Sequence, residues 1–149
     1  MIIEKLRELG YEYEPAPLKH RSFHAAVRSG SLVFSSGQLP MYGDLRFKGR
    51  VGDDIDLESA QKAAEICAFN CLRAIGAAVD IESIRRVVKV FGMVNVADGF
   101  DDTPSVINGA TDFLNDVFGA DNTHARSAVG MSLPNNWAVE VELVAECDI

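Results

Sequence analysis

The sequence predicts an α+β fold in which a mixed β-sheet carries two main helices on one of its faces. Helical and strand-like patterns of apolar residues alternate along the 149 residues in the order α-β-β-α-β-α-β-β. Each of the two longest helical segments carries an apolar stripe. The last strand-like segment alternates two sets of side chains, as a strand with one buried face does. A chain of this length can bury one core, so residues 1–149 are expected to form a single domain.

The first elements are a short helix, an extended connector and a hairpin. Apolar residues recur at helical spacing in Met1–Leu9, and two prolines favour an extended chain in Tyr11–His20. Two strand-like runs, Phe23–Arg28 and Leu32–Ser36, flank Ser29-Gly30-Ser31, whose composition predicts a tight turn. The chain therefore enters the sheet through a β-hairpin.

The first long helix follows a segment, Gly37–Gly52, that is predicted to be a loop. Asp56 is a good N-cap, and Glu58 lies in the first turn, where the helix dipole favours an acidic residue. The helix is predicted to extend to about Ala78. One of its faces carries only small side chains and can approach a sheet closely: Ala60, Ala64, Cys67, Cys71, Ala74 and Ala78.

The next two elements are a long strand and a second helix. Ile84–Val96 is rich in β-branched residues at both odd and even positions, which predicts a central strand covered on both faces. Gly92 suggests a bulge in this strand. Thr103 is predicted to be the N-cap of the second helix, with Pro104 at its first position. Gly119 is a natural end for this helix.

The chain ends in two strand candidates, Ala125–Met131 and Trp137–Glu146, which we expect to be hairpin neighbours. One of the two alternating sets of side chains on the last strand is apolar and is expected to pack against the helices. The other set mixes carboxylates with apolar residues, which fits an oligomer interface or the wall of a site. Two apolar faces need two partners, so we expect a homo-oligomer.

The composition excludes several classes of function. The 14 basic and 22 acidic residues give a formal net charge of −8, and the basic residues are not clustered, so nucleic-acid binding is disfavoured. The three cysteines lack zinc-ligand spacing and are expected to be reduced and to pack like small apolar residues. No apolar segment approaches the ~20 residues that span a bilayer, and no signal sequence is recognisable. The expected location is cytoplasmic, with no membrane partner, metal or cofactor.

Two charged residues near the end of the chain are candidates for chemistry. Arg126 opens one strand candidate, and Glu140 lies on the next, so we expect both at the same end or on the same face of the sheet. An arginine binds a small carboxylate through two charge-assisted hydrogen bonds. A neighbouring glutamate can activate a water molecule as a general base. A structural salt bridge between the two residues is an equally acceptable interpretation.

The residues around this pair resemble the signature of the YjgF/RidA family. The signature comprises His124-Ala125-Arg126-Ser127-Ala128-Val129, then Leu133-Pro134, then Val139-Glu140-Val141-Glu142. Ser35-Ser36-Gly37-Gln38-Leu39-Pro40 is similar to the second hallmark of the family. The similarity covers about residues 20–147 in the expected order, and residues 1–10 look like an N-terminal helical addition found in a longer subgroup.

The resemblance implies a chorismate-mutase-like fold that assembles as a homotrimer, with the sheets forming an inner barrel and the sites in clefts between subunits. It also implies an enzyme similar to 2-iminobutanoate/2-iminopropanoate deaminases. These hydrolyse reactive 2-imino and enamine acids to 2-keto acids and ammonia without cofactor or metal.

Carried over to this chain, the family pattern assigns Arg126 to binding the substrate carboxylate and Glu140 to positioning the attacking water. Ser36 and Gly37 match the loop that lines the site, and Asn108 matches an asparagine close to it. This chain departs from the deaminase pattern at Phe23, where the family usually has tyrosine, and at Ala128, where many members have cysteine.

Two other functions compete with imine hydrolysis. The first is a regulatory trimer that binds a small carboxylate at Arg126 and catalyses nothing; a Glu140→Gln variant distinguishes it from an enzyme. The second follows the older family label of endoribonuclease or translation inhibitor, which the net charge of −8 disfavours.

Overall fold

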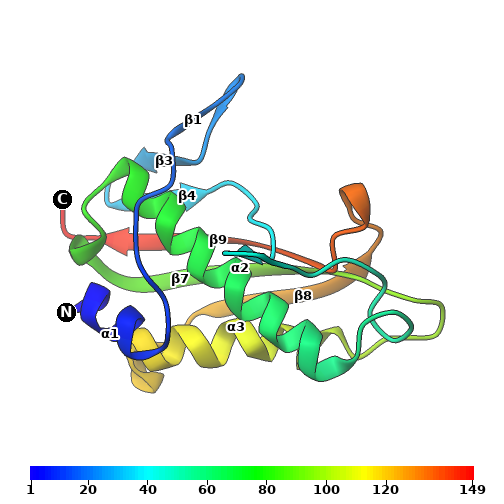
Figure 1. The fold of residues 1–149 in the computed structure, drawn as a ribbon. Coiled ribbons are helices and arrows are strands. Elements are labelled where there is room, and N and C mark those ends of the chain that lie inside the picture. Colours follow the sequence, from blue (N-terminus) through cyan, green and yellow to red (C-terminus); the bar gives the residue numbers. More distant parts are fainter.

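The computed structural model describes residues 1–149 and has the predicted α+β architecture. A five-stranded mixed sheet has the strand order β3-β4-β9-β7-β8, and helices α2 and α3 cover one of its faces (Figure 1). The other face carries no helix. The strands are β3 (Ala26–Ser29), β4 (Leu32–Ser35), β7 (Ile84–Asn95), β8 (Ala125–Met131) and β9 (Val139–Cys147).

Helix α2 (Leu57–Ala78) packs its small-residue face against β9, as the sequence predicted. The carboxylate of Asp56 accepts a hydrogen bond from the backbone N–H of Ser59, which caps the helix. All three cysteines are reduced and buried. Cys67 and Cys71 donate their thiol hydrogens to the carbonyl oxygens of Val139 and Val141. The small side chains therefore bring the helix close enough to hydrogen-bond the strand beneath it.

Helix α3 (Thr103–Phe118) begins one residue earlier than predicted. Asp102 is the N-cap, so the prediction for Thr103 is wrong, because the Thr103 hydroxyl donates instead to the carbonyl oxygen of Ala128 in the sheet. Gly119 ends the helix with a φ of 94°, a conformation that favours glycine.

Strand β7 is central and pairs antiparallel with β9 and parallel with β8. Its irregularities lie between Ile84 and Arg86 and between Val87 and Lys89, so the bulge expected at Gly92 is absent. A Cβ atom at Gly92 would lie 2.5 Å from the side chain of Ile107. Glycine therefore stands there because α3 packs directly onto the strand.

The expected hairpin between β8 and β9 is wrong. Strand β7 lies between them, and β8 is the edge strand of the sheet. The turn η3 (Pro134–Asn136), with positive φ at Asn135 and Asn136, redirects the chain across β7 instead of folding it back on β8. This position of β7 separates the two chemically interesting strands.

The N-terminal segments pack around this core. Helix α1 (Ile2–Glu8) contacts α3, and the following connector crosses α2 (Figure 1). The run predicted as one strand from Phe23 is two strands, because β1 (Lys19–His20) pairs with β2 (Phe23–His24) in a projecting arm and β3 begins separately. The predicted loop contains a small hairpin of β5 (Met41–Tyr42) and β6 (Leu45–Arg46).

The two faces of the sheet differ in composition. The helix-covered face is apolar and buried, with Val90, Val94 and Val141 fully inaccessible to solvent. The open face bears exposed apolar side chains, since Val27 is 55% and Phe34 is 44% exposed. None of the helices is long and apolar enough to cross a membrane.

Candidate functional site

Arg126 lies on edge strand β8 and turns its side chain toward helix α3. Its register partner on β7 is Val90, a core residue of the helix-covered face. Its Nη1 donates to Asn108 Oδ1 at 2.8 Å and to Thr111 Oγ1 at 3.1 Å. No carboxylate lies within 4.0 Å of the guanidinium. Neutral oxygens thus orient a cation that has no counter-ion, which is a suitable receptor for an anionic ligand.

Ala128 lies two residues further along β8 and therefore on the same face as Arg126. Its register partner is Gly92, and its carbonyl oxygen accepts the hydrogen bond from Thr103. This contact ties β8 to the first turn of α3. Asn108 and Thr111 lie further along the same helix, so the contact also fixes the spacing between them and the strand that carries Arg126.

His124, just before β8, is an unusual neighbour of Arg126. Its Nδ1 hydrogen-bonds the carbonyl oxygen of Ala125 at 3.1 Å, which assigns the neutral-form proton to Nδ1. The other ring nitrogen, Nε2, is buried without a hydrogen-bond partner. Burial lowers the pKa of His124, and the nearby charge of Arg126 lowers it further, although the hydrogen bond to Ala125 opposes the shift. Burial and the charge of Arg126 therefore favour the neutral form of the side chain.

Glu140 lies on β9 and projects from the open face. Its register partner is Met93, the residue before Val94. Because neighbouring side chains on a strand point to opposite faces, Glu140 points away from the helix-covered face. A Cβ atom at Gly37 would lie 2.1 Å from Glu140 Oε2, so glycine is required for this carboxylate to occupy its place. Burial raises the pKa of Glu140, and the charge of Glu142 raises it further. A carboxylate with a raised pKa is a stronger base.

A cavity of about 450 Å³ lies next to Gly37. Phe23, Ser36 and Gly37 line it together with residues of the connector and of α2. The Ser36 hydroxyl donates to the carbonyl oxygen of His24 at 2.7 Å. This hydrogen bond joins the arm that bears Phe23 to the residue that follows β4. Phe23 is 55% exposed, so the arm presents an aromatic ring but no hydroxyl at the mouth.

The seven residues predicted to form the site therefore fall into two groups. Arg126, Asn108 and Ala128 lie together between β8 and α3. Glu140 contacts Gly37 on the open face, where Ser36 and Phe23 line the adjoining cavity. Because the two groups occupy different faces, Arg126 and Glu140 form no salt bridge within the chain.

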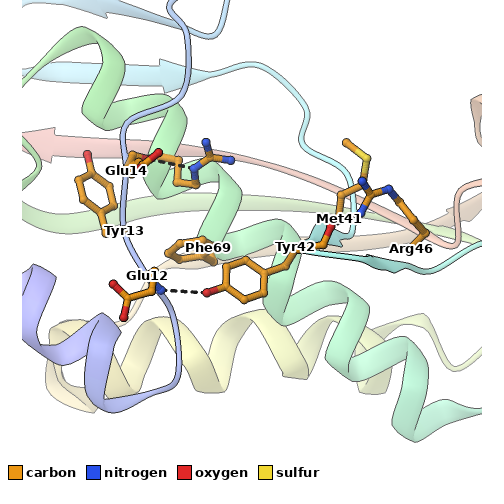
Figure 2. A pocket seen from close by; sticks show the side chains of 9 residues that line it. Glu12, Tyr13, Glu14, Met41, Tyr42, Arg46 and Phe69 are labelled. Carbon is orange, nitrogen blue, oxygen red and sulfur yellow. Dashed lines mark hydrogen bonds between the residues drawn. The ribbon is translucent and has the colours of Figure 1, made fainter.

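The structure also contains a cavity that the sequence did not indicate, shown in Figure 2. Its volume is about 520 Å³, and it lies between the connector, the β5–β6 hairpin and α2. Arg46 and Arg73 both line it. The sequence offers one signal that could have indicated this cavity, namely Arg73, a charged residue in a helix of mostly small and apolar side chains. No group of three or more His, Cys, Asp or Glu side chains is arranged to hold a metal ion.

Comparison with known proteins gives consistent matches over nearly the whole chain. The sequence model of the family described as "YjgF/chorismate mutase-like, putative endoribonuclease" matches residues 12–147. Protein TCP17 of Trypanosoma cruzi is 34% identical over 150 residues, which cover 97% of this chain and 93% of TCP17.

Two solved structures are similar over comparable lengths. That of protein Atu1372 from Agrobacterium tumefaciens is 42% identical, with a TM-score of 0.88 over 99% of this chain and 92% of that one. A structure from Shewanella oneidensis, described as a "putative endoribonuclease", is 26% identical, with a TM-score of 0.87 over 97% of this chain and 98% of that one.

Proposed function

This chain belongs to the YjgF/chorismate mutase-like family, and from that premise we propose that it hydrolyses small reactive 2-imino acids to 2-keto acids and ammonia. The observation that carries the proposal is the guanidinium of Arg126, which Asn108 and Thr111 orient and which no carboxylate neutralises. The substrate carboxylate takes the place of the missing counter-ion.

We propose further that the complete site forms between copies of the chain in a homotrimer. Arg126 and Glu140 project from opposite faces of one sheet, so a substrate that contacts both lies between the Arg126 edge of one copy and the open face of the next. The exposed Val27 and Phe34 of that open face support an assembly in which the face is covered.

The chemistry requires only positioning and one base. Glu140 accepts a proton from water as the water oxygen bonds to the imine carbon, and the C=N electron pair moves to nitrogen, which takes up a proton. The hydroxyl of the tetrahedral adduct then loses its proton while the amino nitrogen gains one, and ammonia leaves as the C–N bond breaks and the carbonyl forms. Imines also hydrolyse without a catalyst, so fixing the carboxylate beside an oriented water is a sufficient source of acceleration.

The test couples an amino-acid dehydratase, which releases 2-imino acids, to this protein and follows loss of the imine. The wild type is expected to accelerate the loss, and Arg126→Ala is expected to abolish the acceleration. Absence of acceleration across several imino acids contradicts the proposal. A second candidate is a carboxylate-binding protein without catalysis, which Phe23 favours because it brings no hydroxyl to the site.

Glu140→Gln separates these two candidates. In an enzyme it removes turnover and leaves carboxylate binding intact. In a carboxylate-binding protein the wild type itself shows no turnover, and both proteins bind the carboxylate. The endoribonuclease description of the family is less suited to this chain because a net charge of −8 repels RNA.

A further inference from the structure

The cavity between the connector, the β5–β6 hairpin and α2 has the chemistry of a second ligand site. None of the seven residues assigned by family resemblance lines this space of about 520 Å³. Its volume falls in the range of small-molecule sites. Its lining combines two guanidinium groups with an aromatic wall.

Arg73 is held in place before any ligand arrives. Its Nε donates to the carbonyl oxygen of Glu14 at 2.8 Å, and its Nη1 donates to Asn70 Oδ1 at 3.4 Å. Asn70 is only 6% exposed, and its Nδ2 donates to the carbonyl oxygens of Leu39 and Met41, both at 2.9 Å. The guanidinium is thus fixed by the connector and, through Asn70, by the segment that enters the hairpin. A pre-oriented cation loses little side-chain entropy on binding an anion.

Arg46 provides a second cation on the hairpin side. Its Nη1 donates to the carbonyl oxygens of Gly43 and Leu45, both at 2.7 Å. Neither Arg46 nor Arg73 has a carboxylate within 4.0 Å, and Nη2 of each makes no hydrogen bond within the protein. The protein therefore leaves donors free on both guanidiniums although its net charge is −8.

Aromatic and apolar side chains also line the cavity, and Figure 2 shows Phe69, Tyr42 and Met41 among them. Phe69 is fully buried and meets the Tyr42 ring edge-on, with ring centroids 5.6 Å apart. The Tyr42 hydroxyl accepts a hydrogen bond from the backbone N–H of Glu12 at 2.9 Å, which fixes the ring. Such a wall favours a planar or apolar ligand body.

We propose that this cavity binds a small organic anion, a carboxylate or phosphate ester with a planar apolar body. The anionic group contacts Arg73 and Arg46, and the body lies on Tyr42 and Met41, which reach the cavity surface in front of the buried Phe69. Glu12 and Glu14 also line the cavity, and their charges exclude polyanions such as RNA while a single anionic group is accepted.

This site does not depend on the proposed function. Arg73 and Met41 also line the cavity that contains Phe23, Ser36 and Gly37, so a ligand here lies beside the segment that carries Gly37. Occupancy is therefore expected to affect that segment. Binding itself is measurable without any assay of activity.

The experiment titrates benzoate and phenyl phosphate, which share a ring but differ in the anionic group, into the isotopically labelled protein and follows backbone amide shifts by NMR. Benzamide is the uncharged control. We expect saturable shifts in Glu12, Tyr42 and Gly43 with one or both anions and none with benzamide. Arg73→Gln is expected to weaken binding at least ~10-fold, because it removes a charged hydrogen-bond donor.

Two further variants keep the test decisive. Arg46 is on an exposed hairpin, so Arg46→Gln is expected to fold normally and to weaken binding several-fold even if Arg73→Gln is unstable. Arg126→Gln is expected to leave these shifts unchanged. Shifts confined to β8, loss of binding in Arg126→Gln, or no saturable binding by either anion would each overturn the proposal.

Discussion

Arg126 and Glu140 lie on opposite faces of the same sheet, separated by β7. Arg126 is in register with Val90, and Glu140 is in register with Met93, three residues further along the same strand. Side chains three apart on a strand point to opposite faces. The pair therefore cannot meet across a short distance within one chain, and chemistry that needs both groups needs two copies.

The first prediction is complementation between two inactive variants. Arg126→Ala keeps Glu140, and Glu140→Gln keeps Arg126, so in the proposed homotrimer a mixture of the two variants contains some clefts in which both native residues meet. With random assembly, about a quarter of the clefts are native. Mixing the two proteins after reversible dissociation is expected to restore about that fraction of wild-type imine hydrolysis. Activity that stays at the level of the separate variants, although the copies exchange, would contradict a site built from Arg126 of one copy and Glu140 of another.

Gly37→Ala tests the contact between this loop and Glu140. The added methyl group would lie 2.1 Å from Glu140 Oε2, so the carboxylate must move. Because the obstructed atom is the end of a flexible side chain, the free energy of unfolding should change by less than about 1 kcal/mol. The rate of imine hydrolysis should fall ~10-fold or more, because the displaced Glu140 carboxylate no longer positions the attacking water. Unchanged kinetics in the folded variant would remove Gly37 from the site.

The sequence predicted the order of the major elements because apolar periodicity and capping residues are local signals. Asp56 and Gly119 mark helix ends through their own hydrogen bonds and backbone angles. The order of strands in the sheet is not local. Nothing in the spacing of Arg126 and Glu140 indicates that β7 lies between their strands, so the expected hairpin and shared face were wrong.

The same reasoning explains the residues that were misread. Gly92 was interpreted as a bulge and Thr103 as an N-cap, both from local propensity. In the structure each has a tertiary role, since Gly92 admits Ile107 and Thr103 bonds the carbonyl of Ala128. Arg73 was not singled out at all, because its importance arises from the connector and hairpin that fold over α2.

Gly109→Ala is expected to destabilise the fold. A Cβ atom at this position of α3 would lie 2.0 Å from the backbone oxygen of Gln61 on α2, and a backbone atom cannot move aside as a side chain does. The two helices would have to separate, at a cost of about 3 kcal/mol. Chemical denaturation measures this change. Asn108→Ala, at the exposed neighbouring position, is the control and should change the free energy of unfolding by less than about 1 kcal/mol.

Asn108 and Thr111 should act on substrate binding through Arg126. Asn108→Ala and Thr111→Val each remove one acceptor that orients Nη1, while Arg126 itself remains. A less ordered guanidinium should raise KM about 5- to 10-fold and leave kcat within about two-fold, because the base Glu140 is untouched. Steady-state kinetics over a range of imine concentrations separate the two constants. A fall in kcat at constant KM would contradict the positioning role.

The last prediction concerns pH and rests on His124. Burial lowers its pKa in the folded protein below the ordinary value of 6.5, while the unfolded chain keeps the ordinary value. The unfolded state therefore binds more protons between these two pKa values, so stability falls as pH drops below about 6.5 toward the lowered pKa. Protonation also puts a second cation beside Arg126 and an unpartnered N–H at the buried Nε2. His124→Gln, which cannot titrate, should lose less thermal stability than the wild type between pH 8 and pH 5. His24→Gln on the exposed arm is the control and should follow the wild type. Equal acid sensitivity of all three proteins would show that protonation of His124 does not lower the stability of the fold.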